Sequence, residues 1–221
     1  MLDANLYLIT DDLRSRGRSV IEVVSAALRG GIGCVQYRPW EKTDAEFLNN
    51  ALKLRAITSA AGAKLIINAR CDIAALADAD GVHLGTGKVP VKAARKILGA
   101  KKIIGFSAHN LKETLKAQDD GADYISLSPL FITTSASIPR PPLGIKQWLK
   151  ITEKIKIPVF ALGGINTDNL KSALNAGINR IAVVSALTDA DDITTAAKIL
   201  TKIMSSRRRH AATHCKIVNF I

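Results

Sequence analysis

The chain has 221 residues, of which 48% are hydrophobic and 23% charged, and its formal net charge is +12. This mix is typical of a globular domain, so disorder over most of the length is not expected. No apolar run reaches the roughly 18 residues of a membrane span and residues 1–5 do not begin a secretory signal, so we expect a cytoplasmic protein that does not engage a membrane.

Short apolar runs typical of strands alternate with amphipathic helical patterns along the chain. The predicted strands are Leu6–Thr10, Cys34–Arg38, Leu65–Asn68, Gly81–Leu84, Ile103–Ser107, Tyr124–Ser128, Val159–Leu162 and Arg180–Ser185. The predicted helices are Val20–Arg29, Ala45–Ala60, Asp72–Ala79, Val91–Leu98, Leu111–Gln118, Ile145–Ile155, Asp168–Ala176 and Ile193–Met204.

Eight strand–helix pairs with mostly continuous apolar strands predict an α/β fold, a (β/α)8 TIM barrel formed by a single domain over residues 1–205. An open doubly wound sheet is the alternative. That fold favours a glycine-rich G-x-G-x-x-G turn after its first strand, and the segment "YLITDDLRSRG" contains none. The barrel is therefore the better prediction.

Residues 206–221 form a basic segment after the last barrel helix, and we expect it to be a flexible tail. The other Lys and Arg residues recur at helical intervals without interleaved aromatic residues, which indicates solvated helix faces and attraction for small phosphorylated ligands rather than nucleic acid. The three cysteines, Cys34, Cys71 and Cys215, are far apart and form no CxxC pair. Their spacing predicts neither a disulfide framework nor a zinc site.

Catalytic groups of such a barrel belong at the carboxyl ends of the strands. The polar and glycine residues there are Thr10, Asp11, Asp12, Gln36, Arg38, Asn68, Arg70, His83, Gly85, Ser107, His109, Ser128, Gly163, Gly164 and Ser185. The loop after the sixth strand, "LFITTSASIPRPPLG", is the longest, and a loop of this length more often covers or contacts a substrate than merely connects.

Gly163-Gly164 ends the seventh strand, and Val184-Ser185 ends the eighth. In barrels this pair of loops commonly binds phosphate through backbone N–H groups and a helix N-terminus. A Cβ at either glycine would hold a phosphate oxygen out of hydrogen-bond range, so we expect a phosphate cup here. A plain tight turn is the alternative.

Eight segments in order and in register, from about Leu6 to Leu187, resemble the thiamin phosphate synthase and thiazole tautomerase superfamily. They are "YLIT", "CVQYR", "LIIN", "DGVHLG", "GFSAH", "GADYISLSPLF", "PVFALGGI" and "AVVSAL". The resemblance implies a transferase of thiamin biosynthesis, which joins a hydroxymethylpyrimidine diphosphate to a thiazole phosphate and releases pyrophosphate. Its ligands would be small phosphorylated thiazoles and pyrimidines. Whether the chain forms a homodimer is left open.

The resemblance also implies roles for individual residues. By this resemblance, Gln36, Arg38 and Asn68 contact the pyrimidine diphosphate, and Ser107 lies near the reacting carbon. Two residues of the long loop, Thr133 and Ser135, hold phosphate oxygens. The thiazole-phosphate cup is formed by Gly164, Val184 and Ser185, together with Gly163. The synthases also use Mg²⁺, held by two aspartates. This chain has Ala69 and Lys88 at those positions, so we predict no metal ligand, and Mg²⁺ is expected only if the synthase reaction is retained.

The chain departs from the synthases at two further positions. The synthases carry phosphate-binding lysines there, and this chain has Trp40 and Ala136. Alternative functions are therefore a metal-free tautomerase-like isomerase and a non-catalytic barrel that binds a phosphorylated ligand. The tautomerase type carries a histidine at the position of Pro129. His109 could take its place as a general acid or base, or it could be a loop residue with a structural hydrogen bond. His83 is predicted to be structural.

Overall fold

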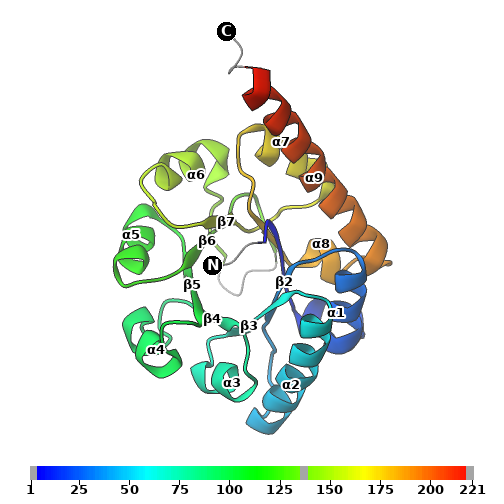
Figure 1. Cartoon of the computed structure of the whole chain (residues 1–221), viewed down its shortest axis with the longest axis vertical. Coiled ribbons are helices and arrows are strands. Elements are labelled where there is room, and N and C mark those ends of the chain that lie inside the picture. Colours follow the sequence, from blue (N-terminus) through cyan, green and yellow to red (C-terminus); the bar gives the residue numbers. More distant parts are fainter. Residues whose placement is uncertain (1–3, 135–138, 218–221) are drawn as a thin grey trace.

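The computed structural model describes residues 4–134 and 139–217, and side chains as far as residue 206. Eight parallel strands close into a barrel in sequence order, with β1 paired to both β2 and β8. Helices surround the strands on the outside (Figure 1). The predicted (β/α)8 barrel is confirmed.

The strands are β1 Leu6–Ile9, β2 Cys34–Tyr37, β3 Lys64–Asn68, β4 Gly81–Leu84, β5 Ile103–Ala108, β6 Tyr124–Leu127, β7 Val159–Ala161 and β8 Ile181–Val183. The helices are η1 Asp12–Arg14, α1 Val20–Arg29, α2 Asp44–Ala60, α3 Cys71–Leu76, α4 Val91–Leu98, α5 Leu111–Asp119, α6 Gly144–Thr152, α7 Thr167–Asn175, α8 Ser185–Thr188 and α9 Ile193–Ile217.

Two short helices were not predicted, because η1 and α8 have three and four residues and carry no helical periodicity. The predicted end of the eighth strand is wrong: β8 stops at Val183, and Ser185 begins α8. Helix α9 continues to Ile217, so most of the segment 206–221 belongs to the last helix of the chain. Its assignment as a separate flexible tail stays a prediction.

The strands separate two apolar cores because successive side chains point to opposite faces. Leu8, Val35 and Ile67 pack outward among the helices. Tyr7 and Cys34 pack inside the barrel. Burying a large apolar side chain stabilises the fold by about 1.5–3 kcal/mol. Side chains on both faces of each strand therefore contribute to the stability of the barrel.

Three aromatic rings fill the barrel interior. Tyr7, Tyr124 and Phe160 are fully buried, and each pair meets edge to face with centroids 5.6–6.0 Å apart. Gly105 on β5 provides the space for one of these rings: a Cβ there would lie 2.5 Å from the Tyr124 hydroxyl oxygen and closer still to ring carbons. The interior is thus packed around three large rings, and a glycine on β5 makes room for one of them.

The β1–α1 loop is bound to the segment that follows β8. Arg18 donates hydrogen bonds of 2.8 Å to the carbonyl oxygens of Thr188 and Ala190. Arg14 and Arg16 form ion pairs with Asp189 and Asp191. These contacts join residues about 170 positions apart in the sequence, next to the seam where β1 pairs with β8. We call this set the seam clamp.

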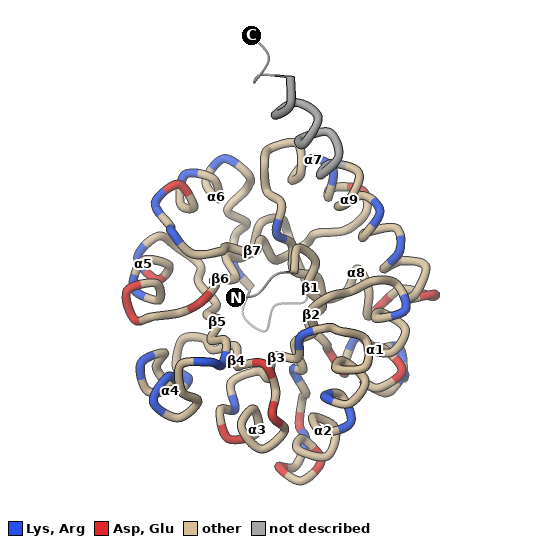
Figure 2. Tube along the Cα trace, in the orientation of Figure 1, with Lys and Arg blue, Asp and Glu red and all other residues tan. Residues whose placement is uncertain are grey.

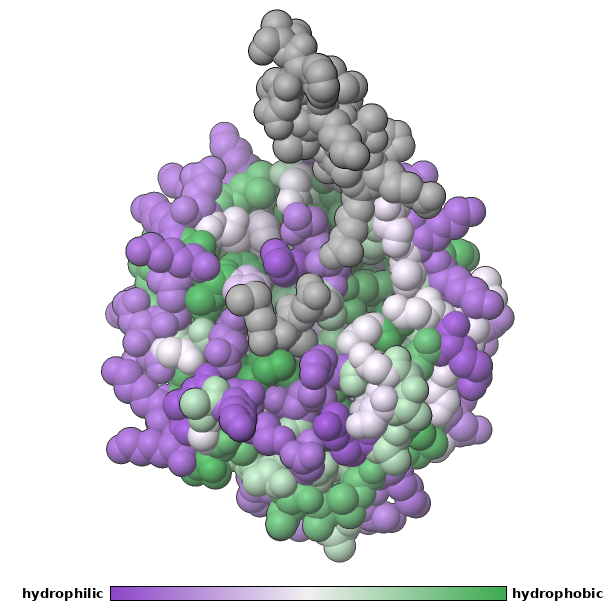
Figure 3. Space-filling model, in the orientation of Figure 1, coloured by the Kyte–Doolittle hydropathy of each residue, from purple (hydrophilic) through white to green (hydrophobic). Residues whose placement is uncertain are grey.

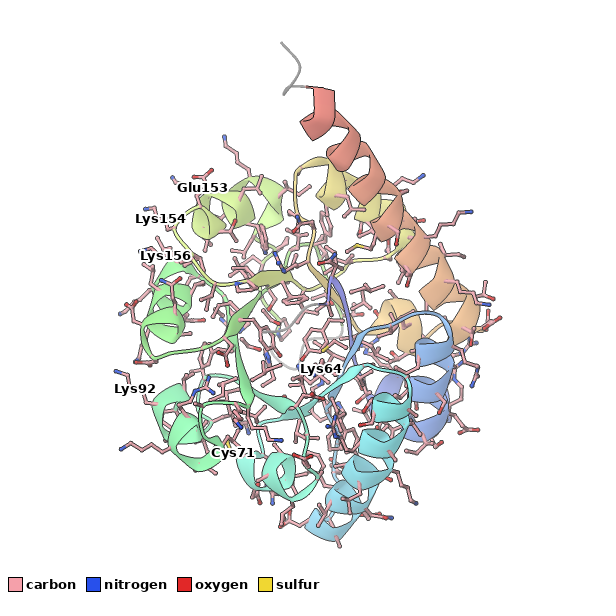
Figure 4. The ribbon with its side chains drawn as sticks, in the orientation of Figure 1. Lys64, Cys71, Lys92, Glu153, Lys154 and Lys156 are labelled. Atoms are coloured by element: carbon pink, nitrogen blue, oxygen red, sulfur yellow. The ribbon has the colours of Figure 1, made fainter. Side chains whose placement is uncertain are left out.

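The basic residues lie mainly on the outer helices (Figure 2). Lys92, Lys154 and Lys156 point away from the barrel (Figure 4), and hydrophilic side chains line much of the left and right edges of the face in view (Figure 3). This distribution is the one expected for solvated helix faces. Among the helices in the described part of the chain, none is long and apolar enough to cross a membrane.

Candidate active site

Polar side chains converge at the carboxyl ends of β2, β3 and β5. Gln36 is 2% exposed, and its neighbours Val35 and Tyr37 pack in the outer core, which places Gln36 on the inward face. Asn68 ends β3, and Ser107 is the next-to-last residue of β5. Because the strands are parallel and form a closed barrel, these three predicted site residues share one mouth.

A chain of hydrogen bonds crosses the barrel interior beneath this mouth. The Gln36 Nε2 group donates to the Tyr7 hydroxyl (2.5 Å), which bonds the Tyr124 hydroxyl (2.9 Å). Tyr124 bonds Nδ1 of His83 (2.9 Å), and Nε2 of His83 bonds Oγ of Ser107 (2.8 Å). We call these five residues the interior chain; it joins two predicted site residues, Gln36 and Ser107.

The interior chain carries no charge. Burial lowers the pKa of His83 to about 3, so its imidazole is neutral at physiological pH. Burial also raises the pKa values of the Tyr7 and Tyr124 hydroxyls well above their usual range. A structural His83 was expected from the sequence, whereas Tyr7 and Tyr124 were not identified. The signal was available, since both tyrosines occupy inward-facing positions in their strands.

Arg38 extends past the end of β2 into a partly buried polar cluster. Its Nη2 group donates to Asp11 Oδ2 (2.9 Å), and its guanidinium lies 5.8 Å from the centroid of a Trp40 ring. Asp11 is 4% exposed and also caps η1 by accepting from the Leu13 amide (3.1 Å). Two N–H donors in this cluster, Arg38 Nε and Trp40 Nε1, are buried without a hydrogen-bond partner among the described residues.

The turn after β3 has a backbone conformation that alanine rarely adopts. Ala69 has φ +62°, and its amide donates to the carbonyl of His83 on β4 (2.8 Å), which holds it there. Left-handed backbone costs a residue with a Cβ roughly 1–2 kcal/mol, and Asn or Asp tolerates it best. The turn thus has the geometry that suits an aspartate, the residue that the synthases carry here, although the carboxylate is absent.

The residues present do not fit Mg²⁺, which prefers carboxylate oxygens. Lys88 is exposed after β4, and Asp72 is held by Arg70 through two hydrogen bonds that lower its pKa to about 2. Within residues 4–134 and 139–206, no three His, Cys, Asp or Glu side chains form a group that could hold a metal ion. No catalytic step is therefore assigned to a metal.

Gly163 and Gly164 have positive φ angles of 101° and 65°, and both lie against the loop that follows β6. A Cβ at Gly163 would be 2.6 Å from Pro129 Cβ, and one at Gly164 would overlap the Ile132 carbonyl. The Phe131 amide also donates to the Gly163 carbonyl (3.0 Å). Both glycines are therefore required for packing of this loop, whether or not phosphate binds, and a bulky substitution would test both roles at once.

The remaining predicted site residues come from three loops. Val184 is the N-cap of α8 and Ser185 is its first residue, so both follow β8 instead of ending it, and their role in a phosphate cup stays a prediction. Thr133 is half-buried in the long loop, where the Arg14 Nη2 group donates to the neighbouring Thr134 carbonyl (2.6 Å). Ser135, and Ala136 beside it, lie outside the described residues.

His109 follows β5 and is tied to the residue before Pro129. Its Nδ1 bonds the Ser128 carbonyl (2.9 Å), and its amide donates to Glu113 (2.8 Å). A carbonyl can only accept, so Nδ1 is the donor in this bond. The predicted structural hydrogen bond is present, and it leaves a ring nitrogen without a hydrogen bond to any described residue.

Comparisons with known proteins agree with this architecture. The family model described as "Thiamine monophosphate synthase" matches residues 6–187. The chain is similar to the thiamine-phosphate synthase of Chloroflexus aurantiacus, with 43% identity covering 96% of this chain and 97% of the relative. It is similar to that of Clostridium novyi, with 44% identity covering 91% and 99%.

Among solved structures, thiamine phosphate pyrophosphorylase from Pyrococcus furiosus superimposes with a TM-score of 0.84 at 36% identity, covering 93% of this chain and 97% of that one. The family match covers most of the chain, and the relatives are matched over nearly their whole length. The chain therefore belongs to the thiamine monophosphate synthase family.

Proposed function

We propose that this protein joins a hydroxymethylpyrimidine diphosphate to a thiazole phosphate in the cytoplasm. The bond between the pyrimidine methylene carbon and the diphosphate oxygen breaks, a bond from the thiazole nitrogen to that carbon forms, and pyrophosphate leaves. The diphosphate gains charge as the bond breaks, so hydrogen-bond donors placed there should contribute most to catalysis. Small phosphorylated molecules, not nucleic acid, are the proposed ligands.

The observation that carries this proposal is the pair of unpaired donors beside β2. Buried N–H groups are rarely left without an acceptor, and Arg38 Nε and Trp40 Nε1 are both in this state. They lie where the resemblance places an arginine and a lysine that bind the diphosphate. Anionic oxygens would satisfy both donors, so Trp40 replaces the lysine as a neutral donor.

Replacing Trp40 with phenylalanine should weaken pyrophosphate binding by about tenfold or more, because a hydrogen bond to a charged group is worth roughly 1.5–3 kcal/mol and the ring is retained. The measurement is calorimetric titration with pyrophosphate, followed by steady-state assay of pyrophosphate release. The matched control is Trp148→Phe, since Trp148 is the other tryptophan and its Nε1 already donates to the Leu127 carbonyl (3.4 Å), so that it offers no unpaired donor. Equal affinities in the two variants would remove Trp40 from the site.

Restoring the two carboxylates should create a metal site. The double variant A69D/K88D is expected to bind Mg²⁺ at least tenfold more tightly than the parent, because two carboxylates would then lie at the mouth and aspartate suits the left-handed turn. Thermal shift with increasing MgCl₂ measures this, with each single variant as a control. If the pair binds no better than either single variant, positions 69 and 88 do not share a site.

A second candidate, isomerisation of a thiazole carboxylate phosphate, is favoured by one observation. His109 contacts the residue next to Pro129, where the tautomerase type has its histidine, and has Nε2 available as a base. Incubating the protein with the thiazole carboxylate phosphate alone, and separately with both synthase substrates, distinguishes the two reactions. Thiamin phosphate as product supports the synthase, and an isomerised thiazole with no condensation would replace the synthase by the isomerase.

A further inference from the structure

We propose that His83 and Tyr124 are positioning residues that orient the Ser107 hydroxyl as a hydrogen-bond donor toward the substrate. The inference rests on the proposed synthase reaction, in which Ser107 lies near the reacting carbon. Neither residue needs to contact the substrate, because both are buried beneath the mouth. Their effect would pass through the hydrogen bond from His83 to Ser107.

The direction of every proton follows from one end of the interior chain. The Gln36 amide nitrogen can only donate, so the Tyr7 oxygen accepts from it. Tyr7 has one proton, and its other partner is the Tyr124 hydroxyl, which must therefore accept. Tyr124 in turn has one proton, which goes to Nδ1 of His83.

His83 must then be the neutral tautomer with its proton on Nε2. That proton is donated to Oγ of Ser107 (2.8 Å), which uses the oxygen of Ser107 as an acceptor. The Ser107 hydroxyl consequently donates to no residue of the interior chain, and it can donate its proton to a substrate at the mouth. A donor fixed in this way costs little reorganisation when negative charge develops on the departing diphosphate.

Packing fixes the positions of the side chains in the interior chain. The Tyr124 ring is confined between Tyr7 and Phe160 by edge-to-face contacts, and it lies 5.4 Å from the His83 ring, centroid to centroid. It occupies the space above Gly105. Packing therefore fixes the position of the Tyr124 hydroxyl oxygen, which stays within hydrogen-bond distance of both the Tyr7 hydroxyl and Nδ1 of His83.

The kinetic test is a double-mutant cycle on the full chain. We expect Tyr124→Phe to lower kcat about tenfold with little change in KM for thiazole phosphate, because the ring stays and only the hydroxyl is lost. Combined with Ser107→Ala, the same change should cost almost nothing further. The matched control is Tyr37→Phe, a buried strand tyrosine whose hydroxyl accepts from Asn50 on the helix side (3.2 Å) and which should retain kcat.

Independent losses that multiply in the double variant would overturn the proposal, as would an unchanged kcat in Tyr124→Phe. Urea unfolding of each variant checks that it folds. His83→Gln keeps a donor near the Nε2 position and should retain more kcat than His83→Leu. Equal activities of these two variants would also count against an oriented donor.

A second measurement does not depend on turnover. Nitrogen-15 NMR of the histidine side chains distinguishes the two neutral tautomers, and His83→Gln assigns the His83 signals. A proton on Nε2 supports the proposal, and a proton on Nδ1 reverses the chain and overturns it. If the protein forms no thiamin phosphate, the proposed function fails, and the tautomer still decides the direction of the interior chain.

Discussion

Gly105→Ala is expected to destabilise the protein by about 2–6 kcal/mol. The added methyl would lie 2.5 Å from the Tyr124 hydroxyl oxygen, and the ring is confined by Tyr7 and Phe160, so the strain cannot be relieved by a rotamer change. Overpacking typically costs about 1–3 kcal/mol, and displacing Tyr124 would leave buried hydrogen-bonding groups unpaired at about 1–3 kcal/mol more. The measurement is the free energy of unfolding in urea.

Gly33→Ala is the matched control, since a Cβ at Gly33 meets only Ala4 Cβ at 3.8 Å; its effect should stay within about 0.5 kcal/mol. Removing the Tyr124 ring provides a second check. In a Tyr124→Ala background, Gly105→Ala should lower the free energy of unfolding much less, because the added methyl then faces a cavity. Equal costs in the two backgrounds would mean that Gly105 does not serve to accommodate this ring.

Stability should fall as the pH is lowered from about 6.5 toward 4.5, because of His83. Its pKa is about 3 in the folded protein and about 6.5 in an unfolded chain. Between these values the unfolded state binds a proton that the folded state excludes. Each pH unit in this window should therefore remove about 1.4 kcal/mol of stability. Above pH 6.5 the histidine contributes no slope.

Urea unfolding at pH 7, 6, 5 and 4.5 measures this effect, with His83→Gln as the variant that cannot take up the proton. The difference in stability between the two proteins should shift steadily in favour of the variant as the pH falls. Carboxylates with lowered pKa values, such as Asp72 at about 2, act in the same direction below about pH 5. Both proteins contain them, so their effect cancels in this difference. A pH-independent difference would show that His83 titrates normally.

The sequence predicted the barrel well because its signals were local. Each strand is a short apolar run and each principal helix has an apolar face, so eight repeats could be counted without knowledge of any tertiary contact. The errors lie where local signal is weakest. Helix α8 has four residues, and only its N-cap Val184 separates it from β8, so Ser185 was assigned to a strand that ends at Val183.

The site was harder to predict because its organisation is non-local. Tyr7 and Tyr124 are 117 residues apart and are joined only because β1 and β6 face one interior, so His83 could be predicted as structural but its role between Tyr124 and Ser107 could not. Gly163 and Gly164 show the opposite problem. A glycine pair is typical of phosphate loops, yet the close approach of Pro129 and Ile132 also requires it here.

The seam clamp also bears on how the chain is made. Arg18 cannot reach the Thr188 and Ala190 carbonyls until the ribosome has added about 170 more residues, which takes roughly 10–30 s at bacterial and eukaryotic elongation rates. During that time β1 can pair only with β2. Its other edge, which later pairs with β8, has unpaired N–H and C=O groups that could pair with a strand of another chain. The first barrel strand in sequence order is therefore among the last to be paired on both edges.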